Sequence, residues 1–123
     1  YFKSKNVLVQ VPEPKKMEYI FIHADYSLMK IMLEDILYVE GLKDYIKIHL
    51  RTQKFPVVCR MTMKLIEEKL PSTEFQRIHK SFIVSLKKVE SIRNQKIKIG
   101  ENHIPLSDNY SEQFYQTIGY QKP

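Results

Sequence analysis

The 123-residue chain has the length of one domain, and its 43% hydrophobic fraction excludes disorder over most of that length. Its one cysteine, Cys59, excludes an internal disulfide framework and fits a reducing compartment, so we expect a cytoplasmic protein. The formal net charge of +6 favours a polyanionic partner, and no segment approaches the roughly 20 apolar residues of a membrane span.

The chain is expected to open with a linker or tail over residues 1–18, because Pro12 and Pro14 disfavour both helix and interior strand. β structure follows: "YIFIHA" and "LMKIML" are predicted strands around a turn at "DYS". A short acidic turn, "ED", then leads into a third strand, "ILYVEG", which ends at Gly41. The first third of the folded part is therefore predicted to be entirely β.

Alternation continues in "YIKIHLR", which puts the apolar Ile46, Ile48 and Leu50 on one face of a strand. The next strand, "FPVVC", is predicted at a sheet edge or bulge, since Pro56 cannot donate a hydrogen bond to a ladder. Its cysteine is expected to be a small buried apolar residue.

A helix, "MKLIEEKL", is predicted between the N-cap Thr62 and the helix-ending Pro71. Two strands, "EFQRI" and "SFIV", follow, and then a helical turn that Ser85 is expected to cap. The carboxylates of Glu67 and Glu68 are expected to be solvated on the polar face of the helix.

Three short strands, "ESIRN", "KIKIG" and "HIPLS", precede a C-terminal helix capped by Ser107 and closed by Gly119. Tyr110, Phe114 and Ile118 are the predicted apolar stripe of this helix. The fold class is therefore mostly β, a compact multi-stranded sheet fold of roughly ten short strands with two short helices.

Residues for catalysis or metal binding are not found in any known spacing. The three glycines are too far apart for a phosphate-cradling loop, and the four histidines stand singly on strand-like segments. We therefore expect no enzyme activity, no catalytic residue, no metal, no cofactor and no small-molecule substrate.

Positive charge is concentrated in two blocks. Residues 41–60 hold five Lys or Arg against one Asp, and residues 77–98 hold seven against one Glu. The second block includes the run Arg77-Ile78-His79-Lys80-Ser81, which lies between two predicted core strands. This run is either a solvated turn or a contact site for a polyanion.

Three blocks, "EDILYVEGLKDYIKIHL", "FQRIHKSFIVSLKKVESI" and "IPLSDNY", match in order and spacing a family of known proteins. They resemble the LytTR-type DNA-binding domain, a common output domain of bacterial two-component response regulators. The resemblance covers about residues 19–118, with 119–123 as a tail. It implies loops that enter the DNA major groove, an absent N-terminal receiver domain linked through residues 1–18, phosphorelay signalling, and a dimer on DNA.

The resemblance also carries over three loops as candidates for DNA contact, at 41–45, 79–81 and 107–110. At Asp108 the sequence departs from the family, where a basic residue is common; an aspartate favours the helix dipole and repels phosphate. The predicted DNA-binding residues are Lys43, Asp44, Lys47, Arg77, His79, Lys80, Ser81, Ser107, Asp108 and Asn109.

Several alternatives stay open at this point. Asp44 either contacts DNA or fixes its loop, and Lys47 with Arg51 forms either a positive bank beside the groove or ordinary surface charge. Two other functions compete with duplex binding: a single-stranded nucleic-acid binder that stacks bases on aromatic residues, and a protein-interaction module with a degenerate DNA surface. The aromatic residues in question are Tyr38, Tyr45, Phe75 and Phe82, which we expect to be packing residues.

Overall fold

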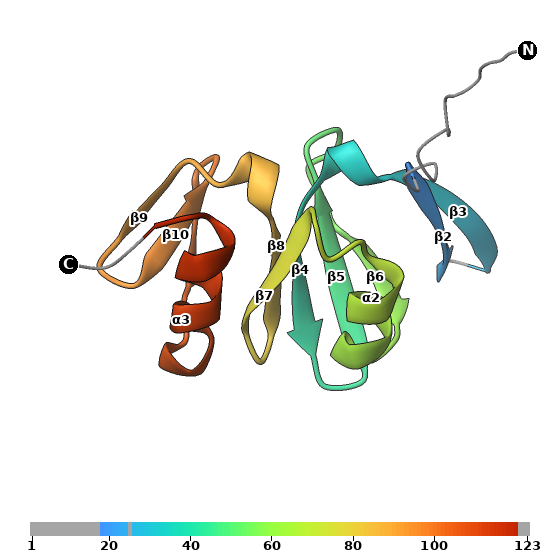
Figure 1. Ribbon diagram of the computed structural model, residues 1–123. Coiled ribbons are helices and arrows are strands. Elements are labelled where there is room, and N and C mark those ends of the chain that lie inside the picture. Colours follow the sequence, from blue (N-terminus) through green and yellow to red (C-terminus); the bar gives the residue numbers. More distant parts are fainter. Residues whose placement is uncertain (1–17, 25, 121–123) are drawn as a thin grey trace, which may run out of the picture.

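The computed structural model describes residues 18–24 and 26–120, and this part of the chain forms ten strands in three antiparallel sheets (Figure 1). Two α-helices and two short 3-10 turns complete it. The prediction of a mostly β fold with two short helices is confirmed. Of the predicted linker at 1–18 and the predicted tail at 119–123, residues 1–17 and 121–123 lie outside the described residues.

The first sheet is a hairpin of β2 (Tyr19–Ala24) and β3 (Ser27–Met32). Alternate residues of β2 are buried, as period-2 patterning requires. The hairpin therefore presents one face to the core and leaves Phe21 and Leu28 half or more exposed on the outside.

The central sheet has five strands in the order β6-β5-β4-β8-β7. Ile46, Ile48 and Leu50 are buried on one face of β5, as predicted, and β6 is an edge strand that begins directly after Pro56. The strands are β4 (Ile36–Leu42), β5 (Tyr45–Leu50), β6 (Val57–Arg60), β7 (Phe75–His79) and β8 (Phe82–Ser85). A 3-10 turn, η1 (Leu33–Asp35), precedes β4.

Helix α2 (Met63–Lys69) packs on one face of this sheet, and its cap is as predicted: the Thr62 hydroxyl accepts from the Leu65 amide at 3.2 Å. Gly41 permits the close approach of helix and sheet, since a Cβ there would lie 2.8 Å from Met63 Cγ. The hairpin, the helix and this face enclose the first core.

The third sheet lies on the opposite face, where β9 (Ser91–Arg93), β10 (Lys96–Ile99) and β11 (Asn102–Pro105) form a second core with α3 (Asp108–Thr117). Neighbouring residues of β8 therefore enter different cores: Ile83 the first and Val84 the second. Being buried on both faces, β8 holds the turn that precedes it in a fixed position.

Two local predictions need correction. The expected helical turn after Ser85 exists as a 3-10 turn, η2 (Leu86–Lys88), but the Ser85 side chain makes no capping hydrogen bond and is buried at the end of β8. The stripe of α3 is narrower than predicted: Phe114 is fully buried, whereas Ile118, the C-cap, is 41% exposed.

Candidate nucleic-acid interface

The three predicted contact segments lie along one edge of the molecule. In Figure 1 the β4–β5 turn, the β7–β8 turn and the first residues of α3 all reach its lower edge. Two backbone hydrogen bonds tie them together, from Gly41 N–H to the Ser81 carbonyl and from Ser107 N–H to the Ile78 carbonyl, both at 2.8 Å. The antiparallel order of the sheet thus joins segments that are far apart in sequence.

The first segment is the two-residue turn Lys43-Asp44, which connects the paired residues Leu42 and Tyr45. Lys43 has a φ of +50°, a conformation that a side chain makes unfavourable, and it is exposed. The turn is anchored through the backbone, since the Asp44 carbonyl accepts from the Met61 amide at 3.1 Å. The exposed carboxylate of Asp44 is not the group that makes this anchor.

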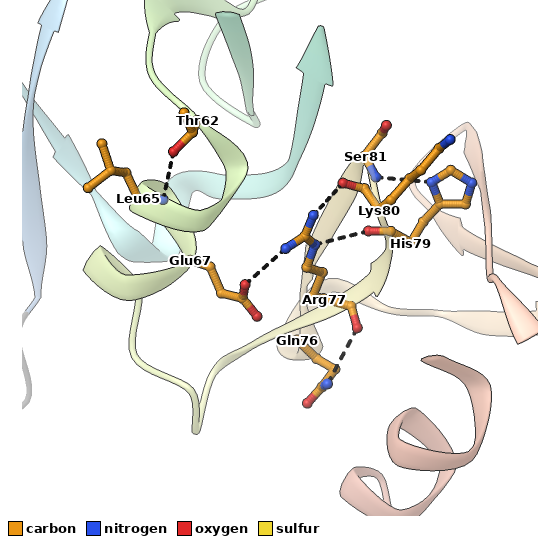
Figure 2. A network of polar contacts seen from close by, with 8 residues as sticks. All are labelled: Thr62, Leu65, Glu67, Gln76, Arg77, His79, Lys80 and Ser81. Carbon is orange, nitrogen blue, oxygen red and sulfur yellow. Dashed lines mark hydrogen bonds and ion pairs between the residues drawn. The ribbon is translucent and has the colours of Figure 1, made fainter. Parts of the chain in front are cut away.

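At the second segment the Arg77 side chain points toward the backbone of the β7–β8 turn and toward Glu67 on α2 (Figure 2). Its Nε donates to the His79 carbonyl at 3.3 Å, one Nη to the Lys80 carbonyl at 2.6 Å, and the other to Glu67 at 3.2 Å. The guanidinium also lies 5.9 Å from the centre of the Tyr110 ring. With all three nitrogens engaged, Arg77 acts as a clamp on the turn.

His79 supports the same turn from its other side. Its Nδ1 accepts from the Ser81 amide at 3.0 Å, so the proton of the neutral ring sits on Nε2. Its ring packs edge-on against Phe82, with centroids 5.5 Å apart. Lys80, in contrast, is exposed, and Figure 2 shows its amine on the side of the turn away from Glu67.

The third segment begins helix α3. The hydroxyl of Ser107 accepts from the Asn109 amide at 3.4 Å, which confirms the predicted N-cap. Asp108 is the first helical residue, and its carboxylate accepts from Gln95 Nε2 at 3.1 Å. Asn109 is exposed and, with His79, Lys80, Ser107 and Tyr110, lines an open hollow of about 580 Å³. The second and third segments thus share one concave surface.

A positive bank formed by Lys47 on β5 and Arg51 directly after it, one of the two interpretations left open above, has little support in the structure. Arg51 Nε donates to Asp35 at 2.9 Å, and its guanidinium lies 3.8 Å from Glu34, so its charge is paired. Lys47 is half-buried and directly opposite Glu40 in the register of the sheet. Lys47 is therefore less exposed than Lys43 and Lys80, and Arg51, although exposed, has its charge paired.

The aromatic residues are mainly packing residues. Tyr38 and Phe75 are buried and Phe82 is half-buried, while Tyr45 is 47% exposed. Burial and the neighbouring Glu40 raise the pKa of the Tyr38 hydroxyl, which is therefore neutral at physiological pH. A row of exposed rings on which bases could stack is not present along the described segments of this edge.

Sequence analysis did not identify two residues that hold side chains of the candidate interface in place. Glu67 was expected to be solvated but pairs with Arg77 across the α2–β7 connection, and Gln95 holds Asp108 from the β9–β10 turn. A run of acidic residues on a helix gives no sign of a partner ten residues away, and an isolated glutamine in a turn gives none at all.

Within residues 18–24 and 26–120, no cluster of three or more His, Cys, Asp or Glu side chains could hold a metal ion. Across the same residues, no helix has the length and apolar character needed to cross a membrane.

Known proteins are similar to this chain in sequence and in fold. The profile of the LytTr DNA-binding domain matches residues 26–119. Sensory transduction protein LytT of Bacillus cereus is 30% identical over 110 residues, which cover 84% of this chain and 44% of LytT. LytT of Bacillus anthracis is also 30% identical, with 96% of this chain and 52% of LytT covered. The chain thus spans about half the length of these relatives.

A solved structure supports the fold independently of sequence. The LytTr DNA-binding domain of a methyl-accepting/DNA response regulator from Bacillus cereus superimposes with a TM-score of 0.71 at 16% identity. The superposition covers 85% of this chain and all of that one. The chain therefore belongs to the LytTR DNA-binding domain family.

Proposed function

We propose that this chain is the output domain of a transcriptional response regulator and binds double-stranded DNA sequence-specifically, with its loops in the major groove. The observation that carries the proposal is the shared edge: Lys43, Lys80 and Asn109 are exposed on three segments joined by hydrogen bonds. A single duplex can meet all three segments without the domain opening.

The exposed groups divide between affinity and readout. Lys43, which is exposed on the β4–β5 turn, contacts phosphate and contributes affinity through counterion release. Lys80 and Asn109 face base edges, where lysine donates to guanine and an asparagine amide pairs with adenine. The hydroxyl of Ser107, which lines the same hollow, and that of the half-buried Ser81 next to Lys80 are suited to phosphate oxygens.

The remaining predicted residues act mainly by positioning. Arg77 and His79 hold the carbonyls and amide of the β7–β8 turn, and Asp108 holds Gln95, so their polar groups are engaged before DNA arrives. Asp44 is exposed beside Lys43 in the first segment, and Lys47 is half-buried on β5. This preorganisation reduces the ordering cost of binding.

The domain boundaries and the rest of the polypeptide belong to the same proposal. Residues 19–118 form the DNA-binding unit, and 1–18 link it to an N-terminal receiver domain of a two-component phosphorelay in the cytoplasm. Phosphorylation of that receiver dimerises the protein and places two domains on adjacent half-sites. Support comes from the LytT relatives, of whose length this chain spans about half.

The rival functions have weaker support. A single-stranded binder needs exposed aromatic rings, and of the four candidates Tyr45 alone is more than one-third exposed. A protein-interaction module would account for Asp108 in place of the basic residue common in the family, but the bond to Gln95 and the helix dipole give this carboxylate a structural role.

The experiment is a selection of bound sites from random duplex DNA, followed by fluorescence anisotropy with the selected duplex, a scrambled duplex and the selected single strand. We expect the selected duplex to bind best at physiological salt. Equal affinity for selected and scrambled duplexes, or preference for the single strand, would overturn the proposal.

A further inference from the structure

A second cationic surface lies outside the three contact segments, on the outer face of β9–β10–β11. Along each strand the buried residues, such as Ile97 and Ile104, alternate with outward polar ones. The outward set surrounds an open hollow of about 500 Å³ that is lined by Ser91, Arg93, Asn94, Lys96, Lys98 and His103.

The charges on this outer cationic face are not balanced within the fold. Arg93 is directly opposite Lys96 in the register of β9 and β10. Like charges at directly opposite positions destabilise a sheet. Glu90 lies 3.9 Å from Lys98 and also accepts from the Gly100 amide, but Arg93 and Lys96 have no ion-pair partner among the described residues. A sheet selected for stability alone would alternate the signs.

The position of this face relates it to the proposed DNA surface. Arg93 and Lys96 flank the tight turn Asn94-Gln95, whose two residues have φ values of +53° and +60°. The Gln95 carbonyl accepts from Leu106 N–H at 2.9 Å, and its side chain holds Asp108 at the start of α3. The outer cationic face thus adjoins the third contact segment.

We propose that the outer cationic face binds the phosphate backbone of the same duplex beyond the base pairs that the three segments contact, with Arg93 and Lys96 as its principal contacts. This inference rests on the proposed function and adds a flanking, sequence-independent contact to it. A DNA backbone that runs from the start of α3 across this face brings phosphates close to Arg93 and Lys96 and so reduces the repulsion between these two side chains.

The test compares two double variants of equal charge change. Arg93→Gln with Lys96→Gln removes the proposed contacts, while Lys30→Gln with Lys54→Gln removes two exposed lysines from β3 and from the β5–β6 turn at the opposite edge. Each is titrated with salt on two duplexes: the selected site alone, and the same site extended by one helical turn of about 10 base pairs on each side.

On the extended duplex we expect the Arg93/Lys96 variant to bind about tenfold more weakly, with a salt slope shallower by about 1.8 than the parent. On the short duplex its loss should be no greater than that of the Lys30/Lys54 variant. Equal behaviour of the two variants on the extended duplex would overturn this inference while leaving the proposed function intact. Failure of the parent to prefer its selected duplex would instead overturn the proposed function.

Discussion

The β4–β5 turn and the β7–β8 turn lie at the same edge and each exposes one lysine, Lys43 and Lys80, but they are held in very different ways. Arg77 and His79 tie the second turn through hydrogen bonds to its backbone, whereas the first relies on one bond to the Asp44 carbonyl and keeps Lys43 at a positive φ. Rigid turns suit base readout, and less constrained ones suit phosphate contact. We therefore propose that the β7–β8 turn reads base edges and that the β4–β5 turn contacts phosphate.

Removal of the Arg77 clamp should have the largest effect. Arg77→Ala leaves the His79 and Lys80 carbonyls without their donor and should lower the free energy of unfolding by about 1–3 kcal/mol. It should also abolish the preference for the selected duplex. Denaturant unfolding and anisotropy measure the two effects.

Arg77→Lys is the matched control, because it keeps the charge but not the planar fork that reaches both carbonyls. We expect it to resemble Arg77→Ala. Full stability and full preference in Arg77→Lys would show that Arg77 contributes charge rather than position.

The next effect concerns Lys80 on the rigid turn. Lys80→Ala should lose about 1–3 kcal/mol of discrimination between selected and scrambled duplexes. Stability should not change, since the side chain is exposed. Lys54→Ala, at the opposite edge, is the control for loss of charge alone. Unchanged discrimination in Lys80→Ala would break the comparison between the turns.

Substitution of Lys43 in the β4–β5 turn should change affinity without changing discrimination between duplexes. Lys43→Gly removes the charge and relieves the positive φ, so stability should hold or rise by up to about 1 kcal/mol. Affinity for selected and scrambled duplexes should fall equally, with a salt slope shallower by about 0.9. A selective loss on the selected duplex would make Lys43 a base reader instead.

Asp108 should give the smallest effect. Asp108→Asn keeps an oxygen that accepts from Gln95 but removes a charge that repels phosphate. Affinity for scrambled duplex, measured by anisotropy, should rise a few-fold, and more in Asp108→Arg. A decrease in either variant would assign Asp108 a direct contact with DNA.

Sequence patterns were reliable where one segment carries the signal. Alternation placed Ile46, Ile48 and Leu50 in the core, and the hydroxyls of Thr62 and Ser107 cap the helices that they precede. The family blocks indicated three candidate contact segments, but they did not distinguish the engaged Arg77 from the exposed Lys80. That distinction depends on Glu67 and Tyr110, which come from other elements and meet Arg77 only in the folded protein.

The central claim, that one duplex contacts three joined segments, is tested most directly by following backbone amide NMR signals while the selected duplex is added. We expect the largest shifts at 42–45, 79–82 and 107–110, and little change at the β5–β6 turn at the opposite edge. Shifts concentrated on the β2–β3 hairpin, with these three segments unaffected, would contradict the account.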